Sequence, residues 1–461
     1  KEKAMVLAGG GTWLHLSDKE AFRLTSVGRV VNAGGDNNEL RYAAKGATRD
    51  VSADASLAAA VVDFLARQPV FVRAGDNEVF RSDQTVMAVI GRDGADTYHF
   101  DYLQREGVCR VLMEEAQAID ILSHLEKNPG WLRVGSKVFN TANIDNIWVS
   151  GNGKYEADQT VEISFIAAGK TCKLELKDHA AKELLQNLVE KGGFIAIGQE
   201  FLNPRTVGNI WFESKASIRG DIKYSTGLSK GIICKNVLES EAVEVMDKLA
   251  ALPGFIKAGD YAVVKPDLFD AMSAQASVDK LVFGIEGARC SVDMPSTAAR
   301  RLVSKFATAA RRAKNPDFVQ DEPGSLTRVP KISSAWYSAS KGKFQFVLSG
   351  KDWGCNLGPE QAKEVCAALL EKGGFLTRKD GTLMNMDAVD AIWHDGKVLG
   401  WMTAGGKWSS STVDEKEGPV LIAKAIDPAY VEENPAKQPP VSDAASDLLS
   451  VRMPKPPAPA P

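Results

Sequence analysis

The sequence repeats itself about every sixty residues. An aromatic residue followed by an aliphatic one comes just after a Gly- or Pro-containing break at five places, spaced 63, 61, 63 and 57 residues apart. These pairs are Trp131-Leu132, Phe194-Ile195, Phe255-Ile256, Phe318-Val319 and Phe375-Leu376. Two earlier pairs, Phe71-Val72 and Trp13-Leu14, extend the series to seven units. We place the units at residues 1–67, 68–128, 129–191, 192–252, 253–314, 315–372 and 373–433, followed by a Pro/Ala-rich tail at 434–461.

Several units also agree beyond the first pair. In the third unit the pair leads to Asn140 and then to Ile147-Trp148, and in the fourth unit Asn203 and Ile210-Trp211 occupy the same register. The in-register tryptophans are Trp148, Trp211, Trp336 and Trp393. Four tryptophans in one register indicate a shared fold for the units.

Each unit continues with two segments of alternating apolar residues and ends in an apolar helical stripe. Period-two alternation is typical of strands with one buried face, and the final stripe, as at 178–189, is typical of an amphipathic helix. We expect Asp178 to cap that helix and Gly192-Gly193 to end it. The pattern therefore predicts an α+β protein of seven ββββα repeats.

Almost no linker separates one unit from the next. A unit of about sixty residues is marginally stable alone, so we expect neighbouring units to share interfaces. The sequence thus predicts a rigid array or a ring, with the first and seventh units as atypical ends.

Composition restricts the function classes. The net charge of −3 over 461 residues gives no global attraction to nucleic acid or anionic lipid. Five of the six cysteines fall one per unit near the start of the predicted fourth strand, and we expect them to be buried core residues. The sequence predicts no disulfide, no metal site and no cofactor.

No catalytic motif is convincing. The five histidines have no metal-ligand spacing, and HExxH, paired CxxC and a phosphate-binding loop are absent. Gly227 to Gly231 matches GxSxG, but a strand and not a helix is expected to follow, unlike a nucleophile elbow. We expect that the protein is not an enzyme.

Two sets of residues are candidates for binding. The tryptophan series is expected on the sheet face away from the helix, where it could stack bases of a single strand or pack against another unit or subunit. We favour packing, because the third, fourth and sixth units are neutral. The fifth unit is basic, and its cations either contact phosphate or an acidic partner, or form a solvated face balancing the acidic second unit. These cations are Arg300, Arg301, Lys305, Arg311, Arg312 and Lys314.

The block from Gly198 to Ile210, together with the helix end from Leu188 to Gly192, resembles the short one-module proteins common in bacteriophage genomes. In outline a unit is also similar to LytTR-type DNA-binding modules and to Whirly and transcriptional-coactivator-like single-strand binders. The resemblance implies a phage or bacterial origin and a binding or structural role.

Two functional hypotheses follow. The first is a non-enzymatic structural or assembly protein, such as a bacteriophage virion or assembly component, that binds copies of itself or other assembly proteins. The alternative is a single-stranded nucleic-acid binder that uses the tryptophans and the basic helix. No membrane partner is expected, since no membrane span or secretory signal pattern is found, and we expect a location in the host cytoplasm or the virion.

Overall fold

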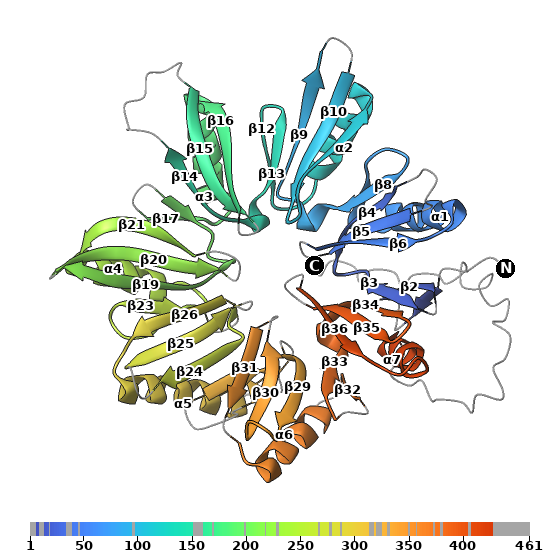
Figure 1. Cartoon of the computed structure of the whole chain (residues 1–461). Helices are drawn as coiled ribbons and strands as arrows, with labels where there is room; N and C mark the ends of the chain where they lie inside the picture. Colours follow the sequence, from blue (N-terminus) through green and yellow to red (C-terminus); the bar gives the residue numbers. More distant parts are fainter. Residues whose placement is uncertain are drawn as a thin grey trace, which may run out of the picture. The chain divides into compact units, whose positions relative to one another are not determined.

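The computed structural model describes most of the chain. The described residues are 6–8, 13–17, 19–33, 39–44, 47–94, 97–150, 160–167, 170–197, 200–216, 218–226, 230–265, 268–275, 279–285, 288–312, 318–319, 325–329, 332–348, 351–355, 357–371, 374–378, 381–403 and 407–426. In this part of the chain, seven small sheets and seven α-helices make up a mixed α+β fold (Figure 1). The tail at 434–461 lies outside the described residues.

Six of the sheets share one plan: three consecutive strands, a helix, then a two-stranded hairpin. The first has β4 (Val27–Asn32), β5 (Glu39–Ala44), β6 (Ala47–Ser52), α1 (Ala55–Ala66), β7 (Phe71–Arg73) and β8 (Glu78–Arg81). The second has β9 (Met87–Asp93), β10 (Thr97–Gln104), β11 (Gly107–Met113), α2 (Glu115–Glu126), β12 (Trp131–Val134) and β13 (Lys137–Asn140). The third has β14 (Ile144–Ser150), β15 (Thr160–Ala167), β16 (Lys170–Lys177), α3 (Asp178–Glu190), β17 (Ile195–Ile197) and β18 (Glu200–Leu202).

The next three sheets follow the same plan. The fourth has β19 (Val207–Ala216), β20 (Arg219–Thr226), β21 (Lys230–Leu238), α4 (Glu239–Ala250), β22 (Ile256–Lys257) and β23 (Ala262–Val264). The fifth has β24 (Ala271–Gln275), β25 (Lys280–Ile285), β26 (Ala288–Asp293), α5 (Ser296–Arg312), β27 (Phe318–Val319) and β28 (Ser325–Arg328). The sixth has β29 (Ile332–Ser338), β30 (Lys343–Leu348), β31 (Lys351–Cys355), α6 (Pro359–Glu371), β32 (Phe375–Thr377) and β33 (Leu383–Asn385). We call each such set a module.

The seventh module takes its strands from both ends of the chain. Its sheet has the order β1-β2-β3-β34-β35-β36, where β1 is Val6–Ala8, β2 Trp13–Ser17, β3 Glu20–Arg23, β34 Val389–Asp395, β35 Val398–Thr403 and β36 Lys407–Thr412, and its helix is α7 (Glu417–Ile426). The pairing of β3 with β34 is antiparallel and sets Ala21 opposite Ile392. The N-terminal hairpin thus fills the place that the next repeat fills in the other modules.

The chain divides into two compact units. The larger comprises residues 26–390 and 402–408, and the smaller comprises both ends of the chain with residues 391–401. Within the larger unit, the hydroxyl of Ser26 donates a hydrogen bond to the carboxylate of Asp390, 364 positions away. The beginning and end of this unit's long segment therefore meet.

The modules differ from the prediction in two respects. The sequence predicted four strands per repeat, but each repeat from the second to the seventh has five, because a break after the second strand separates it from the third. In the third and seventh repeats this break is a one-turn 3₁₀ helix, capped by Asn140 and Asn385 respectively. In addition, six of the seven sheets combine strands of two successive repeats, and the seventh combines strands of the first and last repeats. The hydrogen-bonded unit is therefore shifted along the chain relative to the sequence repeat.

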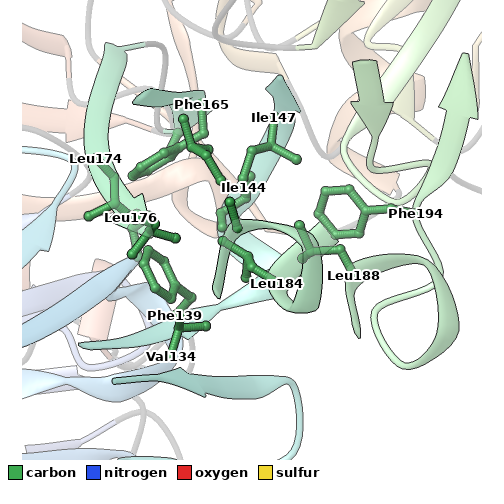
Figure 2. Close-up of a cluster of buried hydrophobic side chains, with 14 of the residues drawn as sticks. Val134, Phe139, Ile144, Ile147, Phe165, Leu174, Leu176, Leu184, Leu188 and Phe194 are labelled. Atoms are coloured by element: carbon green, nitrogen blue, oxygen red, sulfur yellow. The ribbon is translucent and has the colours of Figure 1, made fainter. Parts of the chain in front are cut away.

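Each helix packs on its own sheet. The third module shows the core best: Leu184 and Leu188 of α3 lie in one buried cluster with Phe165 and Leu174 (Figure 2). Val134 and Phe139, from the hairpin of the second module, lie in this same cluster. Neighbouring modules therefore share one hydrophobic core, as the short linkers predicted.

The boundaries of α3 have local causes. Its N-cap residue is Lys177, and the predicted cap Asp178 is instead the first helical residue, with its carboxylate 2.6 Å from the ammonium of Lys182. The helix ends as expected. Gly193 adopts a φ of +72°, which lets the amide of Phe194 donate to the carbonyl of Leu188 at 3.0 Å.

Candidate interaction surfaces

The four predicted tryptophans occupy equivalent places in four sheets. Trp148 lies in β14, Trp211 in β19, Trp336 in β29 and Trp393 in β34, each one residue after a buried residue that faces the module's helix. Strand alternation therefore turns the tryptophans toward the other sheet face. In the remaining modules the same place is held by Val31, Val89 and Ser273.

Trp211 contacts the next module. Its side chain is 9% exposed and belongs to the core cluster of the fifth module, which includes Ala262 and Met272. The other three tryptophans are half-buried. Trp393 lies against Gly400, where an added Cβ would meet its ring at 2.0 Å.

Acidic side chains lie beside two of the tryptophans. Trp148 is opposite Glu200 in the pairing of β14 with β18, and Trp393 is opposite Glu20 in the pairing of β34 with β3. Glu20 is buried and Glu200 half-buried. A carboxylate at this place repels a phosphate backbone, which weighs against single-strand binding along this face.

The local environment shifts the pKa of Glu200. Burial raises its pKa to about 7, although the side-chain amide of Asn146 donates a hydrogen bond to it at 2.8 Å and the charge of Lys235 opposes the rise. The folded protein therefore binds this proton more tightly than the unfolded chain does. Consequently, this group's contribution to stability falls as the pH rises from about 4.5 to about 7.

We expect the Glu200→Gln variant to remove this pH dependence. The free energy of unfolding of the variant minus that of the original chain should increase by about 1–2 kcal/mol between pH 5 and pH 7.5. This value is reduced because the carboxyl is partly exposed to solvent. Urea unfolding at the two pH values measures the difference. Glu183→Gln, on the exposed face of α3, is the control and should leave it unchanged. A Glu200→Gln effect independent of pH would contradict the assignment.

The predicted basic residues lie on α5. Arg300, Arg301 and Lys305 are exposed on the helix surface, while Ala299, Val303 and Ala307 face the sheet of the fifth module. Arg311 and Arg312 form the last turn of α5, and their side chains lie outside the described part, as does all of Lys314. The fifth module is one of those without a tryptophan in the series, since Ser273 stands there. The structure thus places the cations and the tryptophans in different modules.

The cysteines deviate from the expected single register. Three cysteines share one register, each opposite an aromatic residue that is the third from the end of the preceding strand. These pairs are Cys109 with Tyr102, Cys172 with Phe165 and Cys290 with Phe283. In the sixth module that place belongs to Trp353, opposite Phe346, and Cys355 lies two residues further on. Cys109 is buried and Cys172, Cys234 and Cys366 are half-buried free thiols whose pKa is raised by burial.

One set of contacts escaped the sequence analysis. The residue at the end of a module's second hairpin strand, or just after that strand, donates from its side chain to a backbone carbonyl. This carbonyl belongs to the residue that follows the equivalent position in the preceding hairpin. We call these contacts hairpin ties. They join Asn140 to Ser82 at 3.3 Å, Asn203 to Thr141 at 3.0 Å, Lys265 to Pro204 at 3.0 Å and Asn385 to Val329 at 3.4 Å.

The tie position accepts two chemical classes of residue. Where it is Asn, the side-chain oxygen also accepts a backbone N–H two residues on, as Asn203 does from Arg205 at 3.0 Å. Where it is a cation, the side chain lies over the first aromatic ring of its repeat: Arg23 over Trp13, Arg81 over Phe71 and Lys265 over Phe255. The recurring Asn could have suggested the tie, but the cations gave no repeat signal.

No protein-family model matches the chain, and no curated protein matches it in sequence. Across the described residues, no group of three or more His, Cys, Asp or Glu side chains is arranged to hold a metal ion. No helix in the same part of the chain combines the length and apolar character needed to cross a membrane.

Proposed function

We propose that this protein is a non-enzymatic structural or assembly protein: a tandem array of seven small repeats, tied together at its ends, that presents surfaces to protein partners. Copies of itself or other assembly proteins are the proposed partners. A bacteriophage particle, or the host cytoplasm in which one is assembled, is the setting that the sequence resemblance implies.

The observation that carries the proposal is the continuity between modules. Shared hydrophobic cores and hairpin ties join neighbouring modules, and β3 pairs with β34. Such an array transmits load along its length and holds its exposed helices in fixed places, because moving one module breaks contacts with the next. Rigid placement of several surfaces is what a scaffold requires.

Light scattering on the purified protein tests this proposal. We expect the weight-average mass to exceed that of the 49.7 kDa chain and to rise with protein concentration. A mass equal to one chain over the whole range of concentrations would contradict self-assembly.

The alternative, single-strand binding, is favoured only by the exposed cations of α5. A labelled oligonucleotide titrated at low and moderate salt decides it, because phosphate contacts give affinity that falls steeply with salt. We expect no saturable binding. Binding that Trp148→Ala and Arg301→Ala both weaken would replace the assembly proposal with this one.

A further inference from the structure

All charged residues on the outward face of helix α5 are cationic. Its sequence contains no Asp or Glu, and Arg300, Arg301 and Lys305 are exposed. No hydrogen bond or ion pair joins these three side chains to any other described residue. Ala298 and Ser304, both small and exposed, lie beside them. The core residues on the other side of the helix hold this face toward solvent.

Helix α2 carries the opposite charge. Glu115 and Asp120 are exposed on it, Glu114 precedes it as N-cap residue, and the helix contains no Lys or Arg. No ion pair or hydrogen bond to other described residues is found for these three carboxylates. Ile119, 45% exposed, lies next to Asp120 and supplies apolar contact area.

In another acidic helix, α4, three of the four carboxylates already have partners, and only Glu244 has none among the described residues. Glu239 accepts a hydrogen bond from the hydroxyl of Tyr261, and Glu241 accepts one from the amide of Leu238 at 3.0 Å. Asp247 pairs with Lys257 at 2.6 Å. The acidic face of α2 is therefore the better complement to α5.

We propose that the α5 face of one copy of this protein docks on the α2 face of a second copy. The three cations meet the three carboxylates, and Ile119 packs over the small residues of α5. Because the two faces differ, a docked pair still has one free α5 face and one free α2 face. Association therefore continues head to tail. This inference rests on the proposed assembly function and specifies the partner and the surfaces.

Sedimentation velocity on the full chain, freed of nucleic acid, tests the inference. Exposed charge pairs are screened within about 10 Å at 0.1 M salt, so association should depend on ionic strength. At about 20 mM salt we expect the weight-average sedimentation coefficient to rise with concentration, and at about 0.5 M salt we expect it to return to that of one chain.

Two charge-reversed variants identify the surfaces. One carries Arg300→Glu, Arg301→Glu and Lys305→Glu, and the other carries Glu115→Lys and Asp120→Lys. Each variant alone should associate at least about tenfold more weakly, because both of its faces then have the same sign. An equimolar mixture should regain association, since the reversed α5 of one variant fits the reversed α2 of the other. Circular dichroism verifies that both variants fold.

A matched variant controls for net charge. It changes three exposed lysines elsewhere to glutamate, which alters the net charge as much as the α5 variant does: Lys191→Glu, Lys235→Glu and Lys248→Glu. This control should associate like the original chain. If the original chain associates but the α5 variant behaves like this control, the surfaces are wrong while the assembly proposal stands. A mixture that stays dissociated also overturns the pairing of α5 with α2. A chain that stays monomeric at low salt overturns the docking of α5 on α2 and self-assembly, while assembly with other proteins still stands. Single-strand binding that depends on Arg301 would then explain the cations of α5.

Discussion

Replacing Asn203 with aspartate is expected to lower the free energy of unfolding by about 4 kcal/mol at pH 8. The side-chain amide of Asn203 donates to the carbonyls of Thr141 at 3.0 Å and Ile144 at 2.8 Å, and the residue is 1% exposed. Aspartate has the same shape but turns a carboxylate oxygen toward these two carbonyl oxygens. The hairpin tie between neighbouring modules is then replaced by repulsion in a buried place.

The loss should be smaller at pH 5. The buried carboxyl of the variant keeps its proton more readily in the folded state, which raises its pKa above the unfolded value, so stability falls as the pH rises. Urea unfolding at pH 5 and pH 8 measures both effects. Asn236→Asp is the control: Asn236 is exposed and has a φ of +57°, which Asn and Asp both tolerate, so its change should stay within about 0.5 kcal/mol. Equal effects of the two variants would show that the tie contributes little.

Replacing Glu78 with alanine is expected to cost about 3–4 kcal/mol. The Glu78 carboxylate accepts hydrogen bonds from Nε and Nη2 of Arg29 at 2.8 and 3.1 Å, and from the hydroxyl of Tyr102. Burial alone would lower the pKa of the Arg29 guanidinium, but the hydrogen bond to Glu78 and the charges of Tyr102 and Glu78 outweigh burial and raise it. Removing Glu78 leaves a mostly buried cation and a buried hydroxyl without this partner, across the contact between the first and second modules.

An exposed ion pair in the same sheet provides the comparison. Arg41 and Asp50 form it on β5 and β6, with side chains 46% and 47% exposed. Asp50→Ala should cost less than about 1 kcal/mol, because water replaces the lost partner. Thermal and urea unfolding of the two variants, side by side, measure the contrast. If Glu78→Ala costs no more than Asp50→Ala, the buried cluster does not hold the first two modules together.

Strands and helix ends that depend only on residues close in sequence were predicted well. The aromatic–aliphatic pairs mark the first strand of each repeat from the second to the seventh, and the apolar stripe at 178–189 lies in α3. The glycines at 192 and 193 end that helix because only a residue without a Cβ readily adopts the backbone required there. These features follow from periodicity and backbone sterics, which a single segment carries by itself.

The candidate residues were predicted less completely. Repetition identified Trp148, Trp211, Trp336 and Trp393, but not that Glu200 and Glu20 stand opposite two of them. Net charge singled out α5, but the face of α2 that complements it stands out only when the ion pairs of the other helices are known. Lys265 and Asn203 make the same tie with different chemistry, so no residue pattern could connect them.

The sequence by itself determined the period of the repeat, the strand or helix character of its main segments and the apolar face of α3. Tertiary structure alone decided that six of the sheets join two successive repeats, and that the N-terminal hairpin completes the seventh sheet by pairing β3 with β34. The physical reason is that a strand's hydrogen bonds are made with another segment of the chain. Alternating residues show which face of a strand is buried, but the edge of every strand offers the same backbone donors and acceptors. The choice of partner is therefore fixed by how the modules pack.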